Sequence, residues 1–185
     1  MTASNECGDC FACCRALPII QPELQKKAGV LCPHHNGSRH GCTIYETRPT
    51  VCRGFLCGWR LVPELGDAWR PDRSGILMMM VEKADVPENY RPGGDGINFI
   101  VIGGEPAVRR PAFAEYVGTL VRRGVAVYMS DETPKTLINS YLEKQAAMRD
   151  RTGLTAMLLH LYRLHLEQKK LIRQARQAAE GGTGP

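Results

Sequence analysis

Three short apolar runs in the middle of the chain predict buried strands. They cover residues 75–81, 97–102 and 126–129, and turn residues bound each run. Between the second and third runs, residues 112–123 carry apolar side chains at helical spacing and stop before Gly124, which predicts a helix. A strand, a helix and a strand in this order usually give a parallel pair, so we expect a small sheet.

The last third of the chain is predicted to be helical. Thr133 and Pro134 fit the N-cap and the first position of a helix that runs to about Met148. A longer helix is predicted from Leu154 to about Ala178, because apolar residues recur there along one stripe. Residues 180–185 are rich in glycine and predict a disordered tail.

Two shorter helices are predicted near the N-terminus. Residues 21–29 have Pro22 near their start and Gly29 at their end, which fits a short helix. A second helix is expected to begin at Pro49 and to present Cys52 in its first turn, where exposed N–H groups favour a thiolate.

All the cysteines of this protein lie in the first third of the chain, and the remaining two thirds contain none. They are Cys7, Cys10, Cys13, Cys14, Cys32, Cys42, Cys52 and Cys57. So strong a bias indicates a shared role for these thiols.

Metal ligation explains the cluster better than disulfides or isolated buried cysteines do. The N-terminal residues lack a secretory signal, so we expect a cytoplasmic, reducing environment, which disfavours disulfides. Buried cysteines would recur at a helix or strand period, whereas these recur at short gaps beside glycines. A Cys-x2-Cys spacing lets two thiolates meet one ion while glycine lets the backbone turn around it. All the cysteines are therefore candidate metal ligands.

The cysteine spacing also resembles that of a known family. Cys-x2-Cys-x2-Cys-Cys from Cys7, a later Cys-Pro, and Cys-x-Ile-Tyr-Glu-x-Arg-Pro-x2-Cys-Arg from Cys42 are similar to bacterial cysteine-cluster proteins described as zinc- or iron-chelating. The resemblance covers about the first third of the chain and implies metal chelation through these cysteines. One branch of that family resembles flagellin lysine N-methylases, whose chains are much longer.

The cofactor is expected to be an iron-sulfur cluster or zinc, since thiolates suit both. Cys7, Cys10 and Cys13 with a remote Cys-Pro resemble the ligand run of a ferredoxin-type [4Fe-4S] cluster. Zinc needs four thiolates at tetrahedral angles, which several pairs of these cysteines would also supply. The thiols suffice for two such sites, with the adjacent Cys13 and Cys14 on different sites or one of them free.

Arg48, Arg53 and Tyr45 are expected to surround the ligands. A four-thiolate site carries net negative charge, and its burial requires cationic or N–H partners. Both arginines are close in sequence to Cys52, and Tyr45 either offers its hydroxyl to a sulfur or packs in the core. Histidines could replace a cysteine ligand, although a solvated loop is the favoured interpretation of them. These histidines are His34, His35 and His40.

The rest of the chain favours no other activity. The net charge is +5, but the basic C-terminal helix has no interleaved aromatic residues, which argues against a nucleic-acid partner. No apolar run reaches the roughly 18 residues that span a bilayer, so no membrane partner is expected. The glycines at 93–96 and 103–104 predict turns, not a nucleotide or S-adenosylmethionine site. A protein partner stays unknown, and an enzyme is neither shown nor excluded.

These patterns predict an α+β protein with a cysteine-rich metal-binding head, a small sheet flanked by helices and a C-terminal helical segment. The head is expected at 1–60, a small α/β region that completes the same domain at 61–130, C-terminal helices at 131–179, and the tail at 180–185. The expected function is metal binding, with a metal ion as the partner. The alternative is a redox or methyl-transfer enzyme that uses an iron-sulfur centre.

Overall fold

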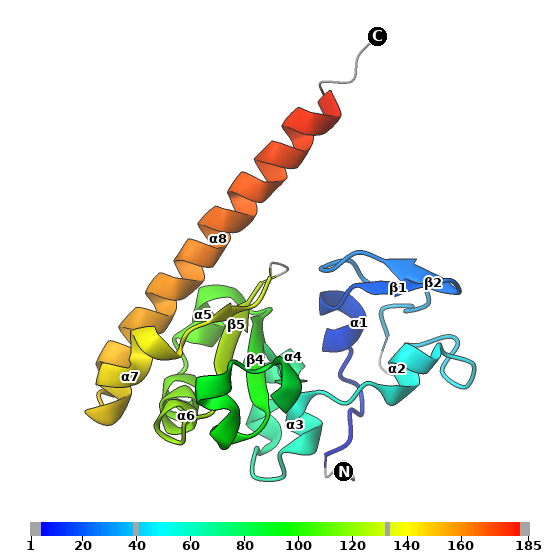
Figure 1. Cartoon of the computed structure of the whole chain (residues 1–185). Coiled ribbons are helices and arrows are strands. Elements are labelled where there is room, and N and C mark those ends of the chain that lie inside the picture. The colour runs from blue at the N-terminus through cyan, green and yellow to red at the C-terminus, as the bar shows by residue number, and fades with distance from the viewer. Residues whose placement is uncertain (1–4, 39–40, 132–133, 182–185) are drawn as a thin grey trace.

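The computed structural model describes residues 5–38, 41–131 and 134–181 and has the predicted α+β architecture (Figure 1). The cysteine-rich head, drawn in blue and cyan, lies beside a body formed by the rest of the chain. In the body, helices flank a four-stranded sheet. The last helix projects away from the body.

The sheet of the body contains the predicted strands and one more. β3 (Ile76–Val81), β4 (Gly96–Val101), β5 (Val127–Ser130) and β6 (Thr136–Leu137) lie side by side in that order. β3 is antiparallel to β4, and β6 is antiparallel to β5. β4 and β5 are parallel, which confirms the prediction from the strand, helix, strand pattern.

The predicted helix start at Thr133 and Pro134 was wrong. Thr133 lies outside the described residues, and Pro134 precedes β6. The helix α7 (Asn139–Ala147) begins after β6, which pairs with β5. The side chain of Asn139 accepts a hydrogen bond from the N–H of Val127 at 2.7 Å, so this polar residue ties the helix start to β5. Tertiary contact, not the local Thr-Pro signal, therefore decides where the helix begins.

The apolar core of the body lies between the sheet and its helices. Phe99 of β4 is fully buried, and its ring meets that of Phe113 edge-on with centroids 5.2 Å apart. Phe113 belongs to α6 (Pro111–Arg122), which confirms the predicted helix. Met78 of β3 is also fully buried, as expected for the apolar run.

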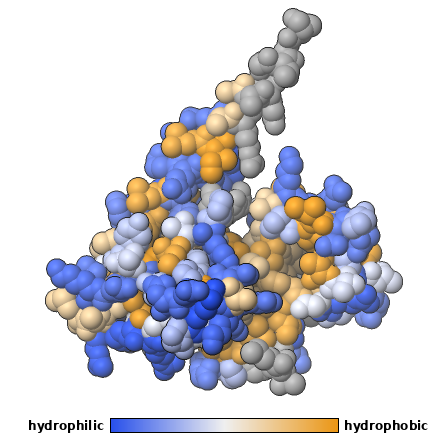
Figure 2. All heavy atoms as spheres, in the orientation of Figure 1, coloured by the Kyte–Doolittle hydropathy of each residue, from blue (hydrophilic) through white to orange (hydrophobic). Residues whose placement is uncertain are grey.

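The long helix α8 (Arg151–Gly181) extends past the body. Figure 2 shows apolar side chains among hydrophilic ones along it, and Leu171 and Ile172 are 63% and 39% exposed. The helix reaches Gly181, so the tail predicted at 180–185 begins too early, and residues 182–185 lie outside the described part. Within the described ranges, no helix combines the length and the apolar character needed to cross a membrane.

Short helical turns connect the larger elements of the body. The glycines at 103–104 were predicted to form a turn, but a short helix begins at Gly104, whose φ of 67° suits glycine. The connecting elements are η1 (Asp67–Trp69), α4 (Pro71–Ser74), η2 (Lys83–Asp85), η3 (Glu88–Gly93) and α5 (Gly104–Val108).

The head contains little regular structure. The predicted helix at 21–29 was wrong, because β1 (Ile19–Gln21) and β2 (Leu24–Lys26) form an antiparallel hairpin there. Burial alternates along β2, with Leu24 and Lys26 inside and the residue between them exposed, so the segment has the period of a strand. The helical elements of the head are α1 (Ala12–Ala16), α2 (Thr50–Gly54) and α3 (Gly58–Leu61).

The helix α3 joins the head to the body. Trp59 is 4% exposed, and its indole N–H donates a hydrogen bond to the carbonyl of Gly66 at 3.2 Å. A side-chain carbon at Gly58 would come within 2.8 Å of the Cβ atom of Met78, so glycine allows α3 to approach β3 closely. The chain immediately after Cys57 is therefore fixed against the sheet.

Candidate metal centre

The first cysteines lie on a tight turn that leads into α1. The backbone N–H of Cys10 donates to the carbonyl of Cys7 at 2.9 Å, and Gly8 has the positive φ of 53° that this turn requires. Cys13 follows in the first turn of α1. Its pKa is raised, mainly by a hydrogen bond to the Cys14 thiolate and by burial, and further by the charges of Cys14, Cys7 and Cys10. Three thiols of this short segment are thus electrostatic neighbours.

A fourth thiol reaches this group from α3. The side-chain N–H of Asn5 donates a hydrogen bond to the carbonyl of Trp59 at 2.8 Å, and the guanidinium of Arg60 donates one to the carbonyl of Asn5 at 2.9 Å. These bonds hold the N-terminal segment beside α3, whose N-cap is Cys57. Burial is the largest cause of the raised pKa of Cys57, and the charge of Cys7 also raises it. We call Cys7, Cys10, Cys13 and Cys57 the inner set.

The other cysteines form a second group around Cys14 of α1. The backbone N–H of Cys32 donates to the carbonyl of Cys14 at 3.0 Å. The loop that follows folds back on itself, because His35 donates to the carbonyl of Cys32 at 3.0 Å and forms an antiparallel bridge with Cys42. Two distant cysteines of the sequence are therefore brought back to α1.

Cys52 completes this second group from α2, as predicted from the Pro49 helix start. The helix places the thiol in its first turn, with Pro49 as the N-cap. Burial is the largest cause of the raised pKa of Cys52, and the charges of Cys14, Cys32 and Cys42 raise it further. We call Cys14, Cys32, Cys42 and Cys52 the outer set.

Lys26 lies against the outer set, and sequence reasoning missed it. Its side chain is buried, with the residue 8% exposed, and its ammonium donates to the backbone carbonyls of Arg15, Leu17 and Lys27. Burial lowers its pKa, while nearby thiolates oppose that shift, those of Cys32 and Cys14 most strongly. The available signal was the alternation along β2, which the predicted helix obscured.

Arg48 is the second cation beside these thiols. Its guanidinium lies 3.8 Å from the ring centroid of Tyr45, whose side chain is more than half exposed. The Nε atom of Arg48 is buried and has no hydrogen-bond partner within the described residues. The pKa of Cys14 is lowered to about 7, first by the hydrogen bond from Cys13, and then, against burial, by the charges of Lys26 and Arg48.

Arg53, the other predicted arginine, occupies a different position. It is exposed, and its guanidinium lies 3.4 Å from the hydroxyl of Thr50 one turn earlier on α2. Its contribution to the thiols stays a prediction. The same holds for a hydrogen bond from Tyr45 to sulfur, since the observed contact of Tyr45 is with Arg48.

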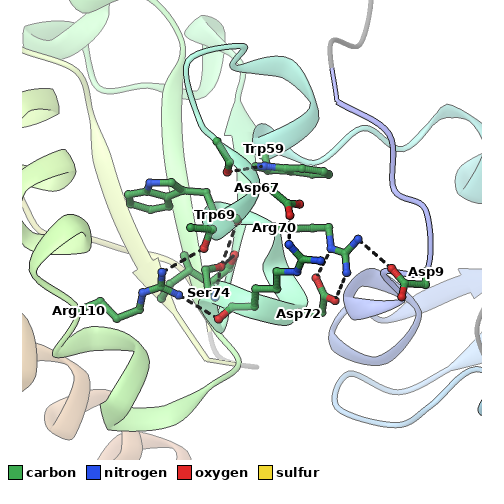
Figure 3. A network of polar contacts seen from close by, with 12 residues as sticks. Asp9, Trp59, Asp67, Trp69, Arg70, Asp72, Ser74 and Arg110 are labelled. Carbon is green, nitrogen blue, oxygen red and sulfur yellow. Dashed lines mark hydrogen bonds and ion pairs between the residues drawn. The ribbon is translucent and has the colours of Figure 1, made fainter.

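The inner set has its own cation, which the sequence did not reveal. Arg70 is 9% exposed and makes a two-pronged ion pair with Asp72 at 2.7 and 2.8 Å (Figure 3). Its third nitrogen lies 2.8 Å from Asp9, in the turn between Cys7 and Cys10. Burial is the main reason why the pKa of Cys10 is raised to about 11, and the charge of Asp72 contributes. An arginine far away in the sequence thus ties the cysteine turn to α4.

His34 and His35 make contacts within the head that support the fold of their loop. The Nδ1 atom of His35 accepts a hydrogen bond from the N–H of Gly37 at 3.0 Å, and its ring lies 4.6 Å from that of Phe11. The carbonyl of His34 accepts a backbone hydrogen bond from Thr43. His40 lies outside the described residues.

All the cysteines are free thiols, and their donor chemistry fits zinc or an iron-sulfur cluster. Among the residues described, no group of three or more His, Cys, Asp or Glu side chains is arranged to hold a metal ion. The thiols are therefore neighbours that have not converged on one point. No family model, curated protein or solved structure matches the chain.

Proposed function

We propose that this protein binds metal through its cysteine thiolates, as zinc or as an iron-sulfur cluster. The observation that carries the proposal is the unpaired, buried Nε of Arg48 beside the outer set. A buried N–H donor without an acceptor is costly, by about 1–3 kcal/mol. A metal-bound thiolate is an acceptor that would satisfy this donor, and neutral thiols are poor substitutes for it.

The charge around the outer set supports the same proposal. Four thiolates around one zinc ion carry a net charge of about minus two, which is unfavourable in a buried site without cations. Lys26 is buried and Arg48 is half-buried beside these sulfurs. Burying an ammonium with only carbonyl partners is unfavourable, whereas burying it against thiolates compensates both charges. The two cations therefore match a thiolate site better than a set of neutral thiols.

A reducing compartment would keep these thiols available as ligands, so the proposal includes a cytoplasmic location. A four-thiolate zinc site would be structural, whereas an iron-sulfur cluster would add the capacity to transfer electrons. Both species take the same soft ligands, so their distinction requires direct analysis of the bound element.

Metal analysis of anaerobically purified protein tests the proposal. We expect stoichiometric zinc, or iron with broad visible absorption that bleaches on reduction. Cys52→Ser should lower the metal content, whereas Val51→Ala, at an exposed neighbouring position on α2, should not. Protein that retains neither element under reducing, anaerobic conditions, and that takes up neither on reconstitution, would overturn the proposal.

A further inference from the structure

We propose that the cysteines form two separate four-thiolate metal sites, the inner set and the outer set, and that the boundary between them falls between Cys13 and Cys14. Each site would take one zinc ion or one iron-sulfur cluster. This inference rests on the proposed function and assigns each ligand to a site.

The inner set is assembled by three backbone segments that hydrogen bonds hold together. The Cys7 to Cys10 turn continues directly into α1, which carries Cys13. The bonds between Asn5 and the α3 residues Trp59 and Arg60 place Cys57 beside the start of that turn. Arg70 holds the turn from the other side through Asp9.

The outer set has an independent scaffold. The backbone hydrogen bond from Cys32 to Cys14 joins the loop to the middle of α1, and the bridge between His35 and Cys42 returns Cys42 to the same loop. Cys52 comes from α2, and Lys26 of the hairpin strand β2 ties that strand to α1 by donating to the carbonyl of Arg15. The two scaffolds meet at α1, where the thiols of Cys13 and Cys14 share a hydrogen bond.

The boundary follows from the geometry of α1. Successive residues of an α-helix are rotated by roughly 100° about its axis, so the Cα–Cβ bonds of Cys13 and Cys14 point in different directions, although the two thiols share a hydrogen bond. The Cys13 thiol is an electrostatic neighbour of Cys7 and Cys10 in the turn, whereas the backbone carbonyl of Cys14 accepts a hydrogen bond from Cys32 in the loop. The two sets adjoin at this pair, and each has four sulfurs, the number that a closed tetrahedral zinc site or a cubane cluster requires.

Paired substitutions test the division, with Zn²⁺ alone as the probe on apoprotein under reducing, anaerobic conditions. The parent protein should bind two equivalents in competition with a chromophoric chelator. The inner double variant Cys10→Ser/Cys57→Ser and the outer double variant Cys32→Ser/Cys52→Ser should each keep one equivalent at the parental affinity. The cross-set double variant Cys10→Ser/Cys52→Ser carries the same number of changes but should keep neither at that affinity.

The outcomes separate this inference from the proposed function. A parent protein that binds no zinc and no iron overturns both. A parent that binds only one equivalent, or a cross-set variant that keeps one tight equivalent while an inner or outer variant loses both, overturns the division alone.

A measurement on the unmodified chain guards against variants that fail to fold. Apoprotein loaded with one equivalent of Zn²⁺ is alkylated, and its peptides are mapped by mass spectrometry. We expect thiols to be protected in fours, with each protected group corresponding to one whole set. Protection that mixes Cys10 with Cys52, or that spreads evenly over all the thiols, contradicts the division.

Discussion

The head and the body of this protein are ordered in different ways. In the body, Phe99, Met78 and many neighbours are completely buried between a sheet and its helices. In the described part of the head, the buried apolar residues are Ala12, Leu24, Cys57 and Trp59, and Trp59 packs toward the body. One fully buried leucine contributes about 1.5–3 kcal/mol, whereas ordering each residue of backbone costs about 1–2 kcal/mol.

The comparison shows that apolar burial cannot account for the order of the head. Its polar and charged contacts, such as the carbonyl bonds of Lys26 and the ion pairs of Arg70, each contribute little on their own. Small segments with so few buried apolar side chains usually depend on disulfides or metals. The thiols of the head are free, so the proposed metal would supply a crosslink of that kind.

If the proposed metal binds, the largest expected effect is therefore unfolding of the head when that metal is removed. Apparent binding free energies of structural zinc sites are about 10–16 kcal/mol and become folding free energy. Chelation under reducing conditions should abolish the hydrogen-exchange protection of α1, α2 and the hairpin, while α6 and β4 keep theirs. Exchange followed by peptide mass spectrometry measures both regions in one sample. Equal protection of the head with and without metal would mean that contacts with the body suffice to order it.

The next effect is smaller and concerns two arginines of the head that the sequence does not distinguish. Arg48 lies beside the outer set with an unpaired Nε, whereas Arg53 is exposed beside Thr50. Loss of a cation next to metal ligands typically weakens metal affinity by about 10- to 100-fold. We expect this loss for Arg48→Gln and a smaller one for the matched variant Arg53→Gln.

Competition with a chelator of known affinity measures both arginine variants against the parent. If Arg53→Gln loses as much affinity as Arg48→Gln, the exposed arginine acts on the thiolates after all. If neither variant differs from the parent, the unpaired Nε of Arg48 has another explanation, and the charge argument for the outer set fails.

The same contrast explains what the sequence could predict. The strand with Phe99 and the helix with Phe113 follow from apolar periodicity, because the same apolar side chains become buried in the core of the body. This periodicity is a local property of the sequence. The cysteine spacing named the candidate ligands, and the helix start at Pro49 predicted that Cys52 lies in the first turn of α2. The spacing could not predict that Arg70 lies beside the site, because the ion pair between Arg70 and Asp9 joins segments far apart in the sequence.

Lys26 was missed for a related reason. Its burial depends on pairing between the strands of the head hairpin, and the proline and glycine signals at 21–29 suggested a helix instead. A buried lysine is rare enough that no local pattern predicts one. The missed residues of the site are therefore those whose positions depend on tertiary contacts.

The smallest expected effect concerns the body and its response to acid. His165 of α8 is 4% exposed, and burial lowers its pKa, although the charge of Asp131 and a hydrogen bond with the backbone of Met129 oppose the shift. The unfolded chain then binds a proton at its ordinary pKa of about 6.5, before the folded chain does. The contribution of His165 to stability is thus complete above that pH and falls as the pH is lowered toward the folded pKa, by about 1.4 kcal/mol for each unit of pKa difference.

This effect separates the body from the head, because both should lose stability in acid for different reasons. In the head, acid would protonate the proposed thiolate ligands and release their ion, whereas the body responds through a buried imidazole. Hydrogen exchange of the α6 amides between about pH 7 and 5 reports the stability of the body alone. In His165→Gln this stability should depend less on pH than in the parent. His160→Gln, at an exposed position on the same helix, is the control and should keep the parental slope. If the slope persists in His165→Gln, the imidazole is not the cause, and release of the proposed metal from the head is the remaining route by which acid would act on the body.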